Sequence, residues 1–147
     1  MTRYFEDFEA GTVRQFGSFS LSEDEIVEFA TQYDPQYLHT DPVAAADGPF
    51  GGLIASGWQT GLECMRLVVE GLLGPADSMG AIGLEELSWP APVRPGDVIE
   101  VENEILETRP SSTRSDRGYV RNRTVASHDG EPVLTWVAVN IIGTRDR

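Results

Sequence analysis

The sequence predicts an α+β domain in which one long apolar helix packs against an antiparallel sheet. Residues 56–73, SGWQTGLECMRLVVEGLL, contain few polar side chains, so a helix here is expected to be largely buried. Residues 79–143 then have the pattern of successive strands, and within 97–108 apolar residues alternate with glutamates, as in a strand with one buried face. A curved sheet wrapped around the single helix would cover the apolar surface of both.

The beginning of the chain predicts a strand followed by a helix. Residues 12–21 alternate in part between apolar and polar side chains, which is typical of a strand. Ser22 and Glu25 have the spacing of a capping box, which opens a helix. This helix is expected to end at Asp34, because the residue before a proline is pushed out of the helical region.

Two short segments and a loop lead from this helix to the apolar one. Residues 35–40 are expected to be extended or turning rather than helical. Asp41 and Pro42 have the pattern of an N-cap followed by proline at the first helical position, and the short helix that they open should close at Gly48. Residues 49–52, PFGG, form a loop of low bulk whose backbone can approach a ligand closely.

The second half of the chain predicts antiparallel strands joined by tight turns. Pro95 and Gly96 stand in the right order for a turn, and Asp129 and Gly130 are a strong hairpin signal. No boundary interrupts the pattern, so residues 1–147 are expected to form a single domain. Strands are expected at residues 79–89, 97–108, 118–128 and 132–143.

Composition restricts the function classes. The chain has 24 acidic and 11 basic residues, all of the latter arginine, and a net charge of −13, which argues against nucleic-acid binding. No apolar run is long enough to span a membrane and the first residues lack a signal-peptide pattern, so a cytoplasmic protein is expected. One cysteine and two histidines argue against a metal site, and no cofactor is expected. Cys64 is expected to be a small core residue.

Arginines crowd into the stretch RPSSTRSDRGYVRNR. A cluster of guanidinium groups in an acidic protein could receive phosphates, or it could form the solvated face of a hairpin, and the sequence leaves both interpretations open. The residues are Arg109, Arg114, Arg117, Arg121 and Arg123.

The stretch YDPQYLHTDPVAAADGPFGGLIASG carries the candidate chemistry. Asp34 and His39 could share one water, as acid–base catalysis requires. Gly57 begins the apolar helix, where a free N–H and the helix dipole favour developing negative charge. An aspartate before proline is also a common helix-ending residue, and a loop histidine is often only hydrogen-bonded. Spacing alone therefore leaves the structural interpretation open.

The segments DPQYLHTD, PFGGLIASGW and LSWPAPVRPGD together resemble the MaoC-like family of (R)-specific enoyl-CoA hydratases and dehydratases. The resemblance implies a hot-dog fold, a homodimer or assembly of dimers, and a hydro-lyase acting on a thioester of CoA or a carrier protein. It also implies that Asp34 is the base toward water, that His39 orients this water and donates the proton, and that the N–H of Gly57 polarises the thioester carbonyl.

The chain departs from the family motif at positions that are expected to shape the acyl pocket. Tyr37 stands in place of proline, Ser56 of histidine and Met65 of serine, while Gln36 replaces asparagine and still offers an amide. The bulky residues Trp58 and Trp89 could line this pocket or pack in the core. The candidate substrate-binding residues are Gln36, Tyr37, Ser56 and Trp58. Two alternatives remain at this point: a hot-dog acyl-CoA thioesterase, and a non-catalytic protein that binds acyl groups.

Overall fold

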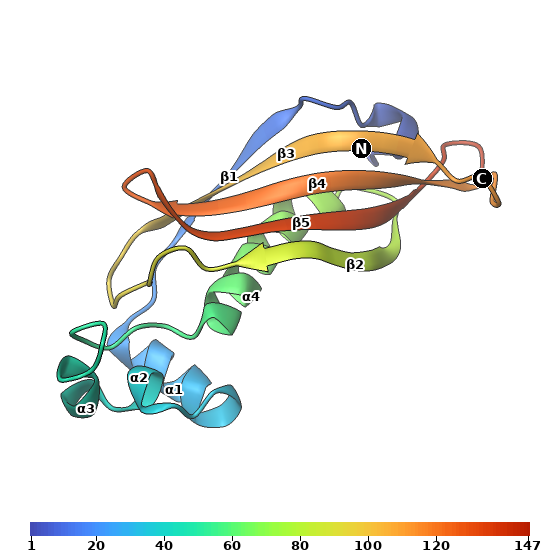
Figure 1. Cartoon of the computed structure of the whole chain (residues 1–147). Helices are drawn as coiled ribbons and strands as arrows, with labels where there is room; N and C mark the ends of the chain where they lie inside the picture. The colour runs from blue at the N-terminus through green and yellow to red at the C-terminus, as the bar shows by residue number, and fades with distance from the viewer.

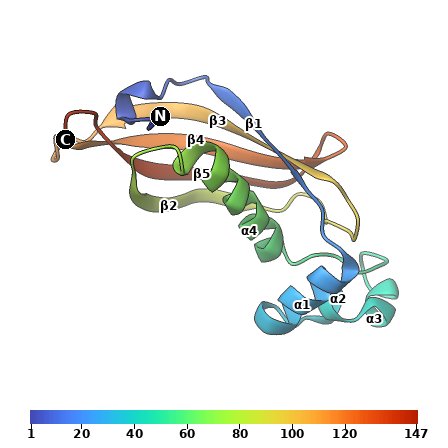
Figure 2. The ribbon, with the colours of Figure 1, turned by 180° about the vertical axis from the view of Figure 1, so that it is seen from behind.

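The computed structural model describes residues 1–147 and contains one five-stranded antiparallel sheet in the order β1-β3-β4-β5-β2. Helix α4 lies along one face of the sheet, and helices α1–α3 gather beyond one end of it, near the start of α4 (Figures 1 and 2). This arrangement is the hot-dog fold that was expected. The strands are β1 Val13–Phe19, β2 Ser78–Ser88, β3 Ile99–Pro110, β4 Arg117–His128 and β5 Glu131–Gly143. The helices are α1 Glu23–Tyr33, α2 Tyr37–Thr40, α3 Pro42–Ala46 and α4 Gly57–Val68, with a short turn at Phe5–Asp7 and a π-helical turn at Val69–Leu73.

Local signals set the ends of several elements as predicted. The Ser22 hydroxyl accepts from the Glu25 N–H while the Glu25 carboxylate accepts from the Ser22 N–H, and this capping box opens α1. Asp34 closes α1, and Asp41 caps α3. At the β4–β5 hairpin Asp129 and Gly130 both have positive φ, 49° and 83°, which a tight primed turn requires.

The alternation in β3 is confirmed. Ile99, Val101 and Ile105 are fully buried on the face toward α4, and the glutamates between them reach solvent. Asn103 shares the buried face, where its amide donates to Asn122 on the neighbouring strand β4. The sheet therefore has one dry face that covers the helix and one wet face.

The prediction of a non-helical segment at residues 35–40 is wrong, because Tyr37–Thr40 forms the single helical turn α2. Pro35 restricts only the residue before it, and the chain recovers helical geometry two residues later. The carbonyl oxygen of Gln36 accepts from the N–H groups of both His39 and Thr40. His39 is consequently held on a helical turn rather than on a loose loop.

Helix α4 is less buried than its composition predicts. The sheet covers the side that carries Cys64, Leu67 and Val68. On the other side an exposed apolar stripe runs along the helix at helical spacing, because a single sheet can cover only one side of a helix. This stripe consists of Trp58, Leu62 and Met65 on α4 and of Val69 at the start of the π-helical turn that follows. None of the helices has the length and apolar character needed to cross a membrane.

Candidate active site

Asp34 and His39 come together at the junction of α1 and α2. Asp34 is the residue at which α1 ends, and His39 lies on the turn that follows. The distance from Asp34 Oδ2 to His39 Nε2 is 3.4 Å. His39 is only 7% exposed and the side chain of Asp34 is 18% exposed, so the imidazole is buried and the carboxylate is partly accessible to solvent.

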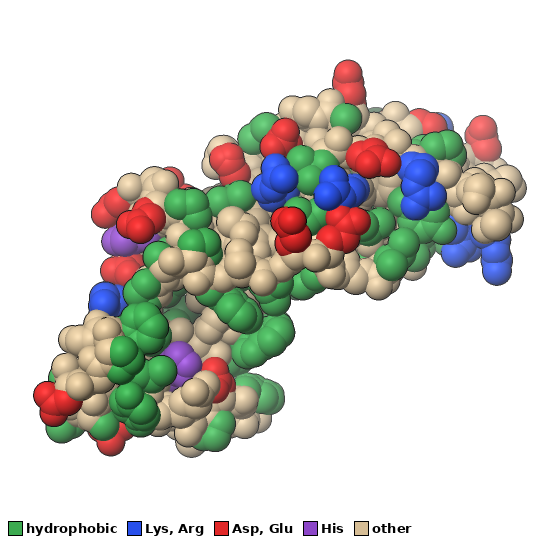
Figure 3. Space-filling view, in the orientation of Figure 1, with side chains coloured by type: hydrophobic (Ala, Val, Ile, Leu, Met, Phe, Trp, Pro, Cys, Tyr) green, Lys and Arg blue, Asp and Glu red, His purple; other side chains and the backbone are tan.

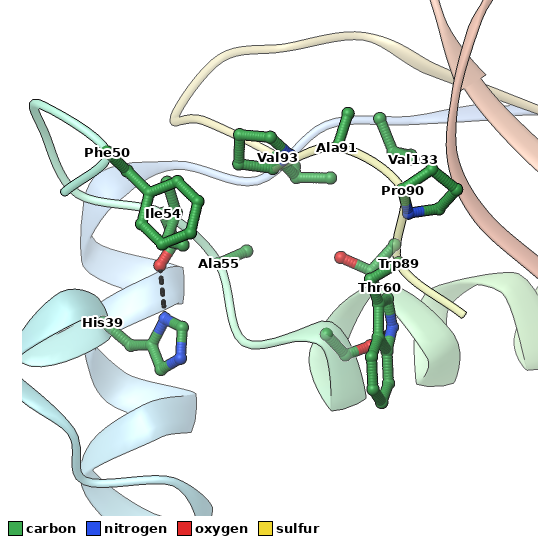
Figure 4. Close-up of a pocket in the computed structure, with 12 residues that line it drawn as sticks. His39, Phe50, Ile54, Ala55, Thr60, Trp89, Pro90, Ala91, Val93 and Val133 are labelled. Carbon is green, nitrogen blue, oxygen red and sulfur yellow. Dashed lines mark hydrogen bonds between the residues drawn. The ribbon is translucent and has the colours of Figure 1, made fainter. Parts of the chain in front are cut away.

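The backbone fixes the tautomer of His39. Its Nδ1 lies 2.7 Å from the carbonyl oxygen of Ile54, as the dashed line in Figure 4 shows. Because a carbonyl oxygen can only accept, Nδ1 carries the proton. In the neutral imidazole Nε2 is then an unprotonated acceptor turned toward Asp34.

Hydrogen bonds hold Asp34 in its ionised form. Gln36 Nε2 donates to Oδ1 at 2.7 Å, and the Ser56 hydroxyl donates to Oδ2 at 2.8 Å. The bond from Gln36 is the main cause that lowers the pKa of Asp34 below its ordinary value, and Ser56 and His39 lower it further against the opposing effect of burial. The pair therefore combines an ionised carboxylate with an imidazole whose Nε2 faces it.

Ser56 connects this pair to the start of α4. Its hydroxyl donates to Asp34 and also accepts from the N–H of Trp58, so it caps the helix while it binds the carboxylate. The next residue, Gly57, has an N–H that donates to no backbone carbonyl. A free donor at the positive end of a helix dipole thus lies one residue from the serine that holds Asp34.

A cavity of about 200 Å³ lies between His39 and the start of α4. Figure 4 shows the imidazole on one side of it and Thr60 and Trp89 on the other. The remaining wall is apolar and comes from the loop before α4, the turn after β2 and β5. The residues of this wall are Phe50, Ile54, Ala55, Pro90, Ala91, Pro92, Val93 and Val133.

Because Gly57 has no side chain, the ring of Trp89 can form part of the wall of this cavity. A Cβ atom at residue 57 would lie 2.3 Å from Cε2 of Trp89, so the ring occupies the space that any side chain would need. Trp89 Nε1 donates to the carbonyl oxygen of Gly57 at 3.0 Å. A second, apolar pocket of about 260 Å³, which Trp58 and Met65 help to line, shares Gly57 and Trp89 with the first. Trp89 therefore forms part of both walls.

The structure brings the three predicted catalytic residues together, but it separates the four candidate substrate-binding residues. Gln36 and Ser56 contact Asp34 and do not line the first cavity. Tyr37 is 48% exposed and packs against the helix end at Gly48. Trp58 lines the second pocket. Ile54 carries no signal in the sequence, because it acts through its backbone carbonyl. Trp89, which could line a pocket or pack in the core, is 41% exposed and lines both pockets.

The arginines of residues 109–123 lie away from this cavity, on strands β3 and β4 and the turn between them. Arg121 pairs with Glu85 at 2.6 Å, Arg117 with Asp116 at 2.8 Å and Arg123 with Glu104 at 3.9 Å. The guanidinium of Arg109 lies over the ring of Tyr119. Figure 3 shows basic and acidic side chains interspersed over the outer face of the sheet, which favours the solvated-face interpretation.

Comparison with known proteins agrees with this fold and site. Residues 7–127 match the model of the MaoC like domain. A 3-hydroxybutyryl-CoA dehydratase of Methylorubrum extorquens is 34% identical over 114 residues, which cover 76% of this chain and 69% of that protein. The crystal structure of a MaoC-like dehydratase from Rhodospirillum rubrum has a TM-score of 0.89 and 36% identity, and the match covers 97% of this chain and 98% of the other.

A further solved structure, the (R)-hydratase from A. caviae involved in PHA biosynthesis, has a TM-score of 0.72 and 26% identity over 92% of this chain and 97% of that chain. The fold and the paired acid and imidazole define a hot-dog protein of the hydratase and dehydratase class. The chain belongs to the MaoC-like dehydratase family.

Proposed function

We propose that this protein adds water to the double bond of an enoyl thioester, or removes it from a 3-hydroxyacyl thioester, whose thiol belongs to CoA or a carrier protein. The observation that carries the proposal is the Nδ1-protonated His39, whose Nε2 faces the ionised Asp34 beside the free N–H of Gly57. The dehydratase from Methylorubrum extorquens and the (R)-hydratase from A. caviae support the same reaction class.

The tautomer of His39 suggests how the proton moves. In this scheme, a water bound by both Asp34 and His39 donates one hydrogen bond to Oδ2 of Asp34 and one to Nε2 of His39. Its oxygen then attacks C3 of the enoyl group, while the proton that it loses passes to Nε2 of His39, and Asp34, the base that the resemblance implies, holds the water in this scheme. His39 Nε2 returns this proton to C2, and the adjacent carboxylate of Asp34 stabilises the imidazolium in between. The water therefore supplies both the hydroxyl and the hydrogen that are added.

Gly57 completes the reaction scheme at the carbonyl. Negative charge develops on the thioester oxygen when water attacks C3, and the free N–H at the start of α4 can stabilise it. The apolar cavity beside His39 excludes water from the acyl chain and strengthens these electrostatic interactions. We further propose (R)-stereochemistry for the hydroxyl-bearing carbon, on the basis of the A. caviae neighbour.

The test removes Nε2 and leaves the fold intact. Asn can offer an amide N–H near the position of Nδ1, so His39→Asn is designed to keep the bond to Ile54 while it deletes the proton acceptor. We expect His39→Asn and Asp34→Asn each to lower kcat for hydration of an enoyl-CoA by about 10²–10⁴-fold, the usual contribution of a positioned acid or base. The assay follows the ultraviolet absorbance of the conjugated double bond, and chiral chromatography of the product tests the (R) assignment.

The matched control is His128→Asn, which changes the other histidine, at the end of β4, and should leave kcat unchanged. Free-thiol release is measured in parallel. Release of CoA without loss of the double bond would identify a thioesterase and refute the proposal. Full hydratase activity in both Asp34→Asn and His39→Asn would show that the named pair is not the catalytic one.

We also propose that a second copy of this chain covers the exposed stripe of α4. The stripe is apolar, and it lies beside β2, an edge strand whose Ile82 and Leu84 are exposed. Light scattering should give twice the chain mass for the native protein and the monomer mass for Leu62→Glu. Val43→Glu, at an exposed apolar residue on α3, is the control that should remain dimeric. A monomeric native protein would refute this proposal. The cytoplasmic location stays a prediction.

A further inference from the structure

We propose that Arg94 binds a phosphate group of the thiol carrier at the mouth of the catalytic cavity. This inference rests on the proposed function. The chemistry recognised is a phosphate ester attached to the pantetheine arm, and two sources share it: the nucleotide part of CoA, and the phosphate that joins pantetheine to the rest of its carrier.

Arg94 is connected to two residues of the cavity wall. It follows Val93, a buried wall residue whose carbonyl oxygen accepts from the N–H of Ala55 at 2.8 Å. Its Nη2 donates to the carbonyl oxygen of Phe50, another wall residue, at 2.7 Å. The guanidinium thus connects the turn after β2 with the glycine loop before α4.

The guanidinium of Arg94 has no carboxylate partner within 4.0 Å. The nearby Asp97 accepts instead from the backbone N–H of Arg94, and its carboxylate also lies close to His128. Most other arginines are paired with carboxylates. These paired residues are Arg66, Arg117, Arg121, Arg123, Arg145 and Arg147. The remaining donors of Arg94 are therefore free for an anion.

The loop under Arg94 offers further donors. Gly51 has a φ of 67°, in the left-handed region, and the N–H groups of Gly52 and Leu53 donate to no backbone carbonyl. A Cβ on Gly52 would lie 3.4 Å from Nη1 of Arg94, so the guanidinium lies over the side of this residue that carries no side chain. Successive free N–H groups beside a planar cation form a concavity that suits phosphate oxygens.

The net charge of the protein explains why binding of an anionic carrier would need a local cation. At −13 the protein repels a polyanionic carrier at long range, so binding requires a local cation close to where the carrier enters. The arginines of residues 109–123 do not lie at this cavity. Arg94 is bonded to the wall residue Phe50, and an arginine–phosphate pair contributes a charge-assisted hydrogen bond that a neutral thioester would not make.

The experiment compares three thioesters of one acyl group: the CoA ester, the 4′-phosphopantetheine ester and the N-acetylcysteamine ester, which has no phosphate. Arg94→Gln is expected to raise KM at least about tenfold for the CoA ester, the equivalent of about 1.4 kcal/mol, and to leave KM for the N-acetylcysteamine ester unchanged. A matching rise for the phosphopantetheine ester assigns the contact to the pantetheine phosphate. A rise for the CoA ester alone assigns it to the nucleotide part.

Arg114→Gln is the matched control, because Arg114 is also exposed and unpaired but lies on the β3–β4 turn. It should leave all three KM values unchanged. Arg94→Lys, which retains the charge without the fork geometry, should fall between the native protein and Arg94→Gln. Equal effects of Arg94→Gln on all three esters, or no effect on any, would overturn the inference.

The inference and the proposed function can fail separately. If the native protein hydrates none of the three esters, the proposed function fails. Calorimetric titration with free CoA then still tests Arg94, since its binding should weaken at least about tenfold in Arg94→Gln and decrease with added salt. Equal affinity of the native protein and Arg94→Gln for CoA would refute the role of Arg94 even in an active hydratase.

Discussion

Gly57→Ala tests whether the start of α4 is built around the ring of Trp89. The added Cβ would meet Cε2, Nε1 and Cδ2 of the ring at 2.3, 2.5 and 2.7 Å, all closer than real Cβ contacts allow. Trp89 must therefore rotate or shift, and its hydrogen bond to the carbonyl oxygen of Gly57 is lost. Because the same residue carries the proposed oxyanion donor, the substitution also moves the wall of the catalytic cavity.

The expected change in the free energy of unfolding has two destabilising contributions and one stabilising contribution. Overpacking typically costs about 1–3 kcal/mol, and loss of a hydrogen bond about 0.5–1.5 kcal/mol. Alanine in place of glycine returns about 1 kcal/mol through helix propensity, although less at the first helical residue. Trp89 is 41% exposed, so its ring can move toward solvent rather than into the core. A net destabilisation of about 1–3 kcal/mol follows.

Gly61→Ala is the matched control, one turn further along α4. There a Cβ would meet Trp136 and Leu134 at ordinary contact distances of 3.7 and 3.8 Å. The same chemical change should therefore be neutral or stabilising by up to about 1 kcal/mol, since the helix gains propensity without a clash. Urea unfolding followed by far-ultraviolet circular dichroism gives both free energies of unfolding, and initial hydration rates are measured on the same samples.

Gly57→Ala should lower the free energy of unfolding whereas Gly61→Ala should not, and only Gly57→Ala should lower kcat. The double variant Gly57→Ala with Trp89→Ala should be more stable than the sum of the single changes predicts, because the clash disappears with the ring. Equal free energies of unfolding for Gly57→Ala and Gly61→Ala would refute the reasoning. Strict additivity in the double variant would show that Trp89 does not occupy the space in solution.

Three further predictions concern buried polar and thiol groups. Ser56→Ala removes a hydrogen-bond donor to Asp34, so the pKa of Asp34 should rise. The carboxylate then protonates at higher pH, and the acid limb of the pH profile of kcat should move to higher pH. Ser56→Thr, which keeps the hydroxyl, is the control. Asn122→Leu leaves the amide oxygen of Asn140 without its partner in a buried layer and should destabilise the protein by about 1–3 kcal/mol in urea unfolding. Burial raises the pKa of Cys64 to about 12, so a disulfide reagent at pH 8 should label it only after unfolding. Rapid labelling of the native protein would contradict this burial.

Elements whose signals are local were predictable from the sequence. The capping box at Ser22 and the hairpin at Asp129 act through residues within a few positions, and the structure confirms both. The alternation in β3 was equally readable, because it depends only on which face of one strand is covered. The helical turn α2 was not, since a proline excludes helix just before itself and says little about the residues that follow.

The exposed stripe on α4 shows a second limit. Composition indicates that a helix needs apolar cover, but it does not say whether that cover comes from the same chain. In this structure the sheet supplies it on the side of Cys64 and leaves Leu62 and Met65 uncovered. A pattern of apolar residues therefore predicted the helix correctly and its burial only in part.

The candidate site depends both on a local motif and on contacts with residues far along the chain. The motif carries Asp34 and His39, but their properties depend on residues far along the chain. The Ile54 carbonyl, 15 positions from His39, sets the tautomer, and Ser56, 22 positions from Asp34, holds the carboxylate. The same two bonds attach the α1–α2 segment to the start of α4, so they position the segment and tune its chemistry at once. For this reason loss of activity in a simple alanine variant of His39 would mix displacement with lost proton transfer, whereas His39→Asn separates them.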